Sequence, residues 1–138
     1  MNTANNQPLI NQLPTSKQLE RTISQKFAAL YRHKLGYFLR QVQCKIFDNY
    51  IVIVADNAIT PLELMIRNSG QIETLLEMRR SIDPVLKSQL SLAIEEIISV
   101  KVEDALCELN FETNRMMAIA ILAETPKVRS SKKLYKSV

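Results

Sequence analysis

The sequence predicts a single α+β domain, in which one antiparallel sheet of two β-hairpins is covered by helices. Three observations predict this fold: an amphipathic stripe over residues 16–34, segments of alternating apolar residues that form two hairpins, and a long helical stretch between the hairpins. The expected order is α-ββ-α-α-ββ. The chain has 138 residues and is 46% hydrophobic, so it can bury the core of one domain.

The first helix is predicted over residues 16–34. Thr15 suits its N-cap, and Gln18 three residues later completes a capping box. Gly36 is expected to end the helix, because glycine readily adopts the left-handed conformation of a C-cap. The apolar residues of the stripe are Leu19, Ile23, Phe27, Leu30, Tyr31 and Leu35. Residues 1–14, rich in Asn and Gln, are expected to be disordered, so the domain is placed at residues 15–126.

A β-hairpin is predicted from residues 40–47 and 50–56. Asp48 and Asn49 form its turn, since both residue types tolerate the positive φ of a two-residue primed turn. This turn would place Phe47 opposite Tyr50. One face of the hairpin is then entirely apolar, as expected for a sheet packed by helices. That face comprises Val42, Cys44, Ile46, Ile51, Ile53 and Ala55.

Thr60-Pro61-Leu62-Glu63 predicts the start of a short helix over about residues 61–68. Thr60 suits the N-cap, Pro61 the first helical position, and Glu63 the capping box, which accounts for all three structurally. A longer helical stretch follows from about residue 69 to 99. Pro84 lies inside it, so we expect a kink or break there, or a new helix with Asp83 as its N-cap.

The second hairpin is predicted from about residues 101–111 and 116–124, with its register open. The second strand is nearly all apolar, so it should be central or covered on both faces. The chain has an internal similarity: Cys44 is followed by a hairpin and Thr60-Pro61, and Cys107 is followed by a hairpin and Thr125-Pro126. This similarity indicates either a duplicated helix–hairpin unit or chance.

The composition excludes several classes of protein. There is no run of 18 apolar residues for a transmembrane helix, and residues 1–14 lack a secretory signal pattern, so a cytoplasmic protein is expected. Two cysteines, Cys44 and Cys107, are too few for a disulfide framework; we expect a reduced, buried pair, which would approach each other only if the hairpins lie suitably. One histidine and two glycines leave no zinc site and no phosphate loop, so no cofactor or metal is expected.

No nucleophile–base pair or converging carboxylates emerge, so we predict no enzyme, unless a site forms between subunits. Arg79 and Arg80 are expected on a solvated helix face; pairing with Glu77 or Asp83, or anion binding at a dimer cleft, are the alternatives.

Charge is unevenly distributed along the chain. The net charge is +4, yet residues 16–126 carry −1, and residues 127–138 carry +5 and are expected to form a flexible basic tail. Opposed charge blocks indicate a partner. The candidate partner-binding residues are Arg67, Arg79, Arg80, Lys127, Arg129, Lys132, Lys133 and Lys136.

The order of these pieces resembles the MpsC-like family over about residues 16–124. Its strongest motif is Ala58-Ile59-Thr60-Pro61-Leu62-Glu63, followed by Arg79-Arg80, Pro84 and Val100-Lys101-Val102. Tyr37-Phe38-Leu39 departs from the family pattern, and Ser99 stands where the family usually has glycine, which indicates a divergent member. The resemblance implies association with a membrane ion or inorganic-carbon transport system, and it implies no catalytic residues.

These observations predict a non-catalytic cytoplasmic regulatory or adaptor protein, itself a homodimer, that binds a protein partner and is peripheral to a membrane complex. The alternative is a nucleic-acid-binding protein that uses the basic first helix and the basic tail. A third hypothesis is an enzyme whose active site lies between subunits.

Overall fold

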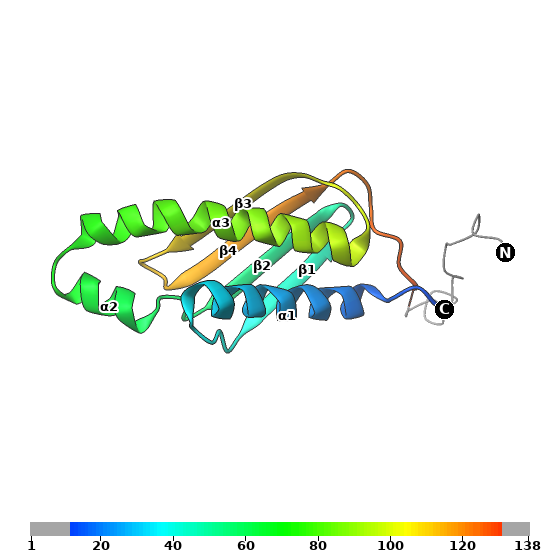
Figure 1. Ribbon diagram of the computed structural model, residues 1–138. Helices are drawn as coiled ribbons and strands as arrows, with labels where there is room; N and C mark the ends of the chain where they lie inside the picture. Colours follow the sequence, from blue (N-terminus) through cyan, green and yellow to red (C-terminus); the bar gives the residue numbers. More distant parts are fainter. Residues whose placement is uncertain (1–11, 131–138) are drawn as a thin grey trace.

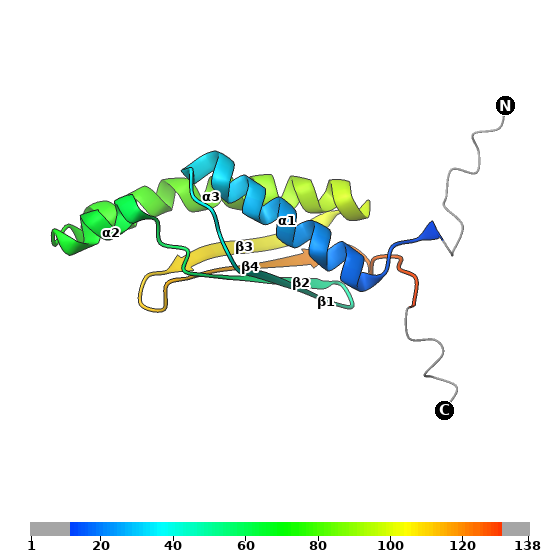
Figure 2. The ribbon, with the colours of Figure 1, turned by 90° about the horizontal axis from the view of Figure 1, so that it is seen from below.

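The computed structural model describes residues 12–130, and it confirms the α+β class and the order of elements. Its four strands form one antiparallel sheet in the order β1-β2-β4-β3, and α1 and α3 lie side by side on one face of it (Figures 1 and 2). The elements are α1 (Ser16–Leu35), β1 (Val42–Phe47), β2 (Tyr50–Asp56), α2 (Pro61–Asn68), α3 (Ile72–Ile98), β3 (Val102–Asn110) and β4 (Arg115–Leu122).

Helix α1 begins and ends as its sequence predicts. Thr15 and Gln18 form the reciprocal capping box, and Gly36 adopts a φ of 66° at the C-cap. Ile23, Phe27 and Tyr31 are buried in the core shared with the sheet and α3, and Leu19 is buried as well. The disorder predicted for residues 1–14 falls mostly on residues 1–11, which lie outside the described residues.

The register of the first hairpin is the predicted one, from Phe47 opposite Tyr50 to Val42 opposite Ala55. The turn differs from the prediction in one respect. Asp48 has a φ of 50°, but Asn49 does not adopt positive φ. Asn49 instead binds β4, donating from its side-chain amide to the carbonyl of Leu122 and accepting from the Leu122 N–H.

Helix α3 is continuous over 27 residues, so the alternative of a new helix capped by Asp83 is wrong. Pro84 leaves the carbonyl of Arg80 without its helical donor, at a cost of about 3 kcal/mol. Ile82 before it and Leu86 after it pack against the same core. Burying Leu86 fully and Ile82 in part is worth about 2–4 kcal/mol, which is comparable to the cost of the proline. None of the helices in residues 12–130 is both long and apolar enough to cross a membrane.

Strand β4 is central, as predicted, and lies between β2 and β3. Coverage on both faces, however, is wrong. Met116, Ala118 and Ala120 are buried under the helices, whereas Met117 and Ile119 point to the other face and are 41% and 44% exposed. The all-apolar sequence of β4 therefore marks two different surfaces of the sheet.

The two hairpins are arranged about an approximate two-fold axis. The order β1-β2-β4-β3 is a mirrored pair of hairpins, and Ile53 pairs with Ala118 at the centre. Cys44 and Cys107 occupy the two outer strands of that same row, so two strands separate them by about 14 Å. A duplicated helix–hairpin unit would give this arrangement. The cysteines do not approach each other: both are free and buried, and burial raises the pKa of each thiol to about 12.

Ser99 ends α3 with a φ of 57°, a conformation that favours glycine. We predict that Ser99→Gly raises the free energy of unfolding by about 0.5–1 kcal/mol, measured as a shift of the urea midpoint. Ser88→Gly, on the exposed side within α3, is the matched control and should lower it by about 0.5 kcal/mol. Destabilisation by both changes would contradict the role of the left-handed cap.

Candidate functional site

The candidate site is built around Arg79, whose side chain projects from α3 into the interior and is almost fully buried. Its guanidinium contacts Glu63 through two bonds, from Nε to Oε2 at 2.6 Å and from Nη2 to Oε1 at 3.0 Å. Nη1 donates to Asp83 Oδ1 at 3.1 Å, and Nη2 also donates to the Tyr31 hydroxyl at 2.6 Å. One cation is therefore shared by two carboxylates and a phenol.

Glu63 has two structural roles at once. Its Oε1 accepts from both the backbone N–H and the hydroxyl of Thr60 at 2.9 Å, which closes the capping box of α2. The same carboxylate holds Arg79, and it is only 2% exposed. The capping box of α2 and the ion pair between α2 and α3 therefore depend on one side chain.

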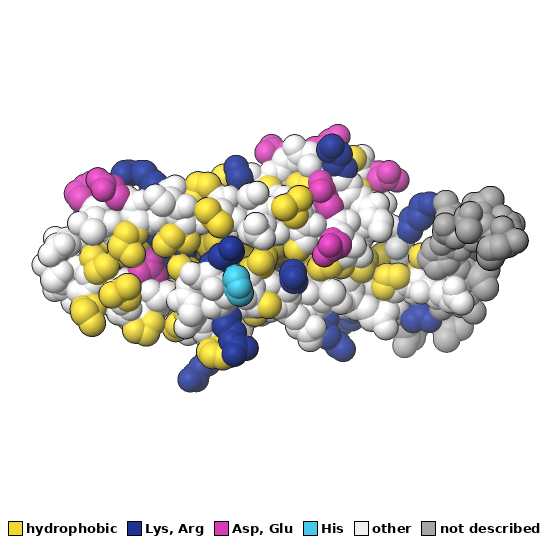
Figure 3. Space-filling model, in the orientation of Figure 1, with side chains coloured by type: hydrophobic (Ala, Val, Ile, Leu, Met, Phe, Trp, Pro, Cys, Tyr) yellow, Lys and Arg dark blue, Asp and Glu magenta, His cyan; other side chains and the backbone are white. Residues whose placement is uncertain are grey.

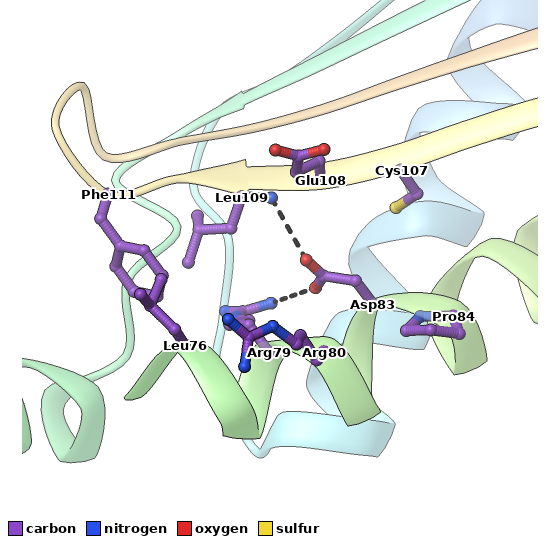
Figure 4. Close-up of a pocket in the computed structure, with 9 residues that line it drawn as sticks. All are labelled: Leu76, Arg79, Arg80, Asp83, Pro84, Cys107, Glu108, Leu109 and Phe111. Atoms are coloured by element: carbon purple, nitrogen blue, oxygen red, sulfur yellow. Dashed lines mark hydrogen bonds and ion pairs between the residues drawn. The ribbon is translucent and has the colours of Figure 1, made fainter. Parts of the chain in front are cut away.

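The remaining partners extend this network to the sheet and to α1. Tyr31 on α1 donates its hydroxyl hydrogen to the carbonyl of Ala58, in the loop before α2. Asp83 accepts from the backbone N–H of Leu109 on β3 at 3.4 Å. Figure 4 shows Asp83 directed from α3 toward β3, between Arg79 and Leu109. Arg79 is consequently linked to all three helices, one edge strand and a loop.

The number of bonds to each carboxylate explains the direction of its pKa. Burial raises the pKa of Glu63, but hydrogen bonds from Arg79 and Thr60 lower it by more, so its pKa lies below its ordinary value. Asp83 receives one bond from Arg79, and there burial prevails and raises the pKa. Burial would lower the pKa of Arg79, yet its bonds to Glu63 and Tyr31 raise it by more, so the guanidinium stays charged. Burial raises the pKa of Tyr31 to about 12, which keeps its hydroxyl protonated.

A pocket of about 440 Å³ lies beside this network, between α3 and β3 (Figure 4). Its lining residues are Leu76, Arg79, Arg80, Asp83, Pro84, Cys107, Glu108, Leu109 and Phe111. Both oxygens of Asp83 and all three guanidinium nitrogens of Arg79 already have protein partners. Within residues 12–130 no group of three or more His, Cys, Asp or Glu side chains could hold a metal ion. The network acts chemically as an ion-paired clamp between elements.

The predicted partner-binding residues are not gathered in one place. Arg79 is buried, so the expectation of a solvated face is wrong for it, whereas Arg80 is exposed. Arg67 on α2 is half-buried and donates to the carbonyl of Phe111 at 3.5 Å. Lys127 and Arg129 are exposed beyond β4. Lys132, Lys133 and Lys136 lie outside the described residues.

The burial of Arg79 and Glu63 was missed by the sequence reasoning, although a signal existed. Arg79 continues the apolar stripe of α3, four residues after Leu75 and seven before Leu86, both of which are buried. A charged residue inside such a stripe requires a buried partner of opposite charge. Glu63 was missed because the capping box already accounted for it.

A second feature is an apolar surface on the end of the molecule that extends past the sheet. There, α2 and the first turns of α3 form a helical hairpin (Figures 1 and 2). Leu62 and Met65 on α2 are 58% and 67% exposed, and Ile72 at the start of α3 is exposed as well. We call these three side chains the hairpin patch. Hydrophobic side chains gather over this end in the space-filling view (Figure 3).

We predict that Arg79→Met lowers the free energy of unfolding by about 3–5 kcal/mol, because it leaves two buried carboxylates without their cation. Arg80→Met is the matched control one residue away. Since Arg80 is exposed, this change should stay within about 0.5 kcal/mol. Urea denaturation followed by circular dichroism measures both. Equal losses for the two variants would show that the network does not hold the fold.

One of three comparisons with known proteins returned a match. Residues 15–124 match the model of the family described as the Na⁺-translocating membrane potential-generating system (MpsC). The search of curated proteins and the search of solved structures each returned no match. The matched range runs from the N-cap of α1 to just beyond β4, and it includes Glu63, Arg79 and Asp83. The resemblance read from the sequence motifs is thereby confirmed, and the chain belongs to the MpsC family.

Proposed function

We propose that the protein is a non-catalytic adaptor or regulatory protein that binds a protein subunit of a membrane ion transport complex from the cytoplasmic side. Membership of the MpsC family links the chain to a Na⁺-translocating membrane potential-generating system. The observation that carries the proposal is the hairpin patch, in which Leu62, Met65 and Ile72 are exposed together at one end of the fold. Clustered, exposed apolar side chains are typical of protein–protein contact sites.

The geometry around the patch favours recognition by a preformed surface. Helix α2 is only eight residues long, and an isolated helix of this length would be unstable in water. Its capping box and the bonds between Glu63 and Arg79 hold it against α3. A partner would therefore meet Leu62 and Met65 in a fixed arrangement, at little cost in ordering the surface. The buried ionisable groups support binding rather than catalysis, because they are used in holding α2.

A photo-crosslinking amino acid at Met65 tests this proposal in the native cell. We predict that it captures an integral subunit of an ion or inorganic-carbon transport complex, identified by mass spectrometry of the membrane fraction. The same amino acid at Leu92, which is 59% exposed on α3, is the matched control and should not capture it. Capture of that subunit from both positions alike, or of no membrane protein from Met65, would contradict the proposal.

A second candidate function, nucleic-acid binding, is favoured by one specific observation. The backbone N–H of Arg129 donates to the carbonyl of Pro14 at 2.8 Å, so the beginning of the basic tail lies against the beginning of α1. Five exposed cations follow on α1: Lys17, Arg21, Lys26, Arg32 and Lys34. The helix and the tail could then act as one basic surface on a phosphate backbone.

Salt-dependent binding to a single-stranded and a double-stranded oligonucleotide tests this second candidate. A nucleic-acid binder should lose affinity as salt rises. Replacing Lys132, Lys133 and Lys136 by Gln should then reduce the slope of log K against log salt by about two to three. No affinity at low salt, or an unchanged slope, would eliminate this function. The hairpin patch plays no part in this measurement, so the two candidate functions are tested separately.

A further inference from the structure

The face of the sheet opposite α1 and α3 is apolar along its two central strands, although no described helix or strand covers it (Figure 2). Side chains alternate along each strand, so the residues that do not face the helices all point to this side. We call it the open sheet face. Five of its side chains are 41–61% exposed: Phe47, Tyr50, Leu106, Met117 and Ile119. Val52, Val54 and Ile121 complete it and are half-buried.

An antiparallel sheet that faces water on one side normally presents polar residues there. The two central strands, β2 and β4, instead present only apolar side chains over three consecutive rows, from Tyr50 and Ile121 to Val54 and Met117. The whole face, four strands spaced by about 4.8 Å and about seven residues long, covers about 450 Å² with its charged edges included. The apolar patch at its centre is of the kind that often marks an interaction site.

The charged residues around the open sheet face are arranged by sign. On the β1 edge, Lys45 lies in the row of Val52, Ile119 and Leu106. On the β3 edge, Asp104 and Glu108 flank Leu106 on either side along the strand. At the end of the central strands, Asp56 on β2 is ion-paired with Arg115 on β4 at 2.9 Å. One edge is thus basic and the opposite edge acidic.

We propose that two copies of this chain pack face to face through their open sheet faces, about a two-fold axis parallel to β2 and β4. This operation places β1 of each copy over β3 of the other. Lys45 then lies between Asp104 and Glu108 of the second copy. Arg115 likewise lies over Asp56 of the second copy, so every charge on the face meets an opposite one.

The charge pattern selects both the occupant and the orientation. A two-fold axis perpendicular to the strands would place Lys45 over Lys45 and the acidic edge over the acidic edge, which repulsion disfavours. A second copy supplies the complementary charges, because the same face carries a basic edge at β1 and an acidic edge at β3. Sheets packed in this way lie about 10 Å apart, with the inner side chains of both filling the space.

The size of the face indicates a reversible dimer. Two copies would bury about 900–1,000 Å² in total, near the lower limit for a specific interface. The apolar centre around Val52 and Ile119 meets its own counterpart at the axis, where truncation is most costly. This inference is independent of the proposed function, because the hairpin patch lies on the projecting end of the helical layer and stays exposed in the dimer.

Sedimentation of the full chain over a range of about 1–200 µM tests the dimer. We expect a species of twice 15.8 kDa to form with rising concentration. Ile119→Lys should weaken dimerisation at least about 10-fold, since it places two cations at the axis. Leu92→Lys makes the same chemical change at an exposed site on α3 and should leave the dissociation constant unchanged. A monomer at every concentration, or a dimer that Ile119→Lys does not weaken, would overturn the proposal.

A charge-reversal experiment at the edges of the face tests the dimer even if Ile119→Lys unfolds the chain. Lys45→Glu and Glu108→Lys should each weaken the dimer about 10-fold, and the double variant should recover most of that loss. Lys45 and Glu108 lie on opposite edges of one sheet and one row apart, about 16 Å from each other, so direct coupling requires contact between copies. Additive losses without recovery would overturn the proposed orientation. Crosslinking from Met65 is unaffected by either result, so failure of the dimer and failure of the partner proposal are distinguishable.

Discussion

The structure depends on the burial of a single positive charge. The side chain of Arg79 reaches from α3 to Glu63 and Asp83. Arginine stays protonated in proteins, so the elements that surround it must supply oxygen atoms as hydrogen-bond acceptors. Glu63 supplies acceptor oxygens from α2, and Tyr31 supplies one from α1. Asp83 also accepts a hydrogen bond from the backbone of β3, so this strand is linked to the same network. Removing the cation leaves carboxylates in the interior, which is more costly than never having placed the pair there. The helical layer is thus positioned on the sheet by direction-specific bonds in addition to apolar packing.

Most of the fold follows from signals local in the sequence. The capping boxes at Thr15 and Thr60 set the starts of α1 and α2, because the reciprocal bonds involve residues only three apart. The two-residue turn at Asp48-Asn49 set the register of β1 and β2 by geometry alone. These interactions join residues close together in the sequence, so a reading of residue types and spacings is sufficient to predict them.

The candidate site was harder to predict because its bonds join residues far apart in the chain. Sequence spacing allowed Arg79 to pair with Asp83 one turn away, but gave no reason to pair it with Glu63, sixteen residues earlier. Pro84 misled in the opposite direction: the local rule predicts an interruption, and packing of Ile82 and Leu86 on one core overrides it. The apolar pattern of β4 could not distinguish a covered face from an open one, since Met117 and Ile119 are as hydrophobic as their buried neighbours.

The continuity of α3 through Pro84 has a geometric consequence. A helix of 27 residues is about 40 Å long, so it fixes the separation between the two ends of the domain. At one end lies the turn between α2 and α3; at the other lie Pro14 and Arg129, where the described chain enters and leaves (Figure 1). The turn between α2 and α3 and the contact between Pro14 and Arg129 are therefore kept apart by the length of one unbroken helix.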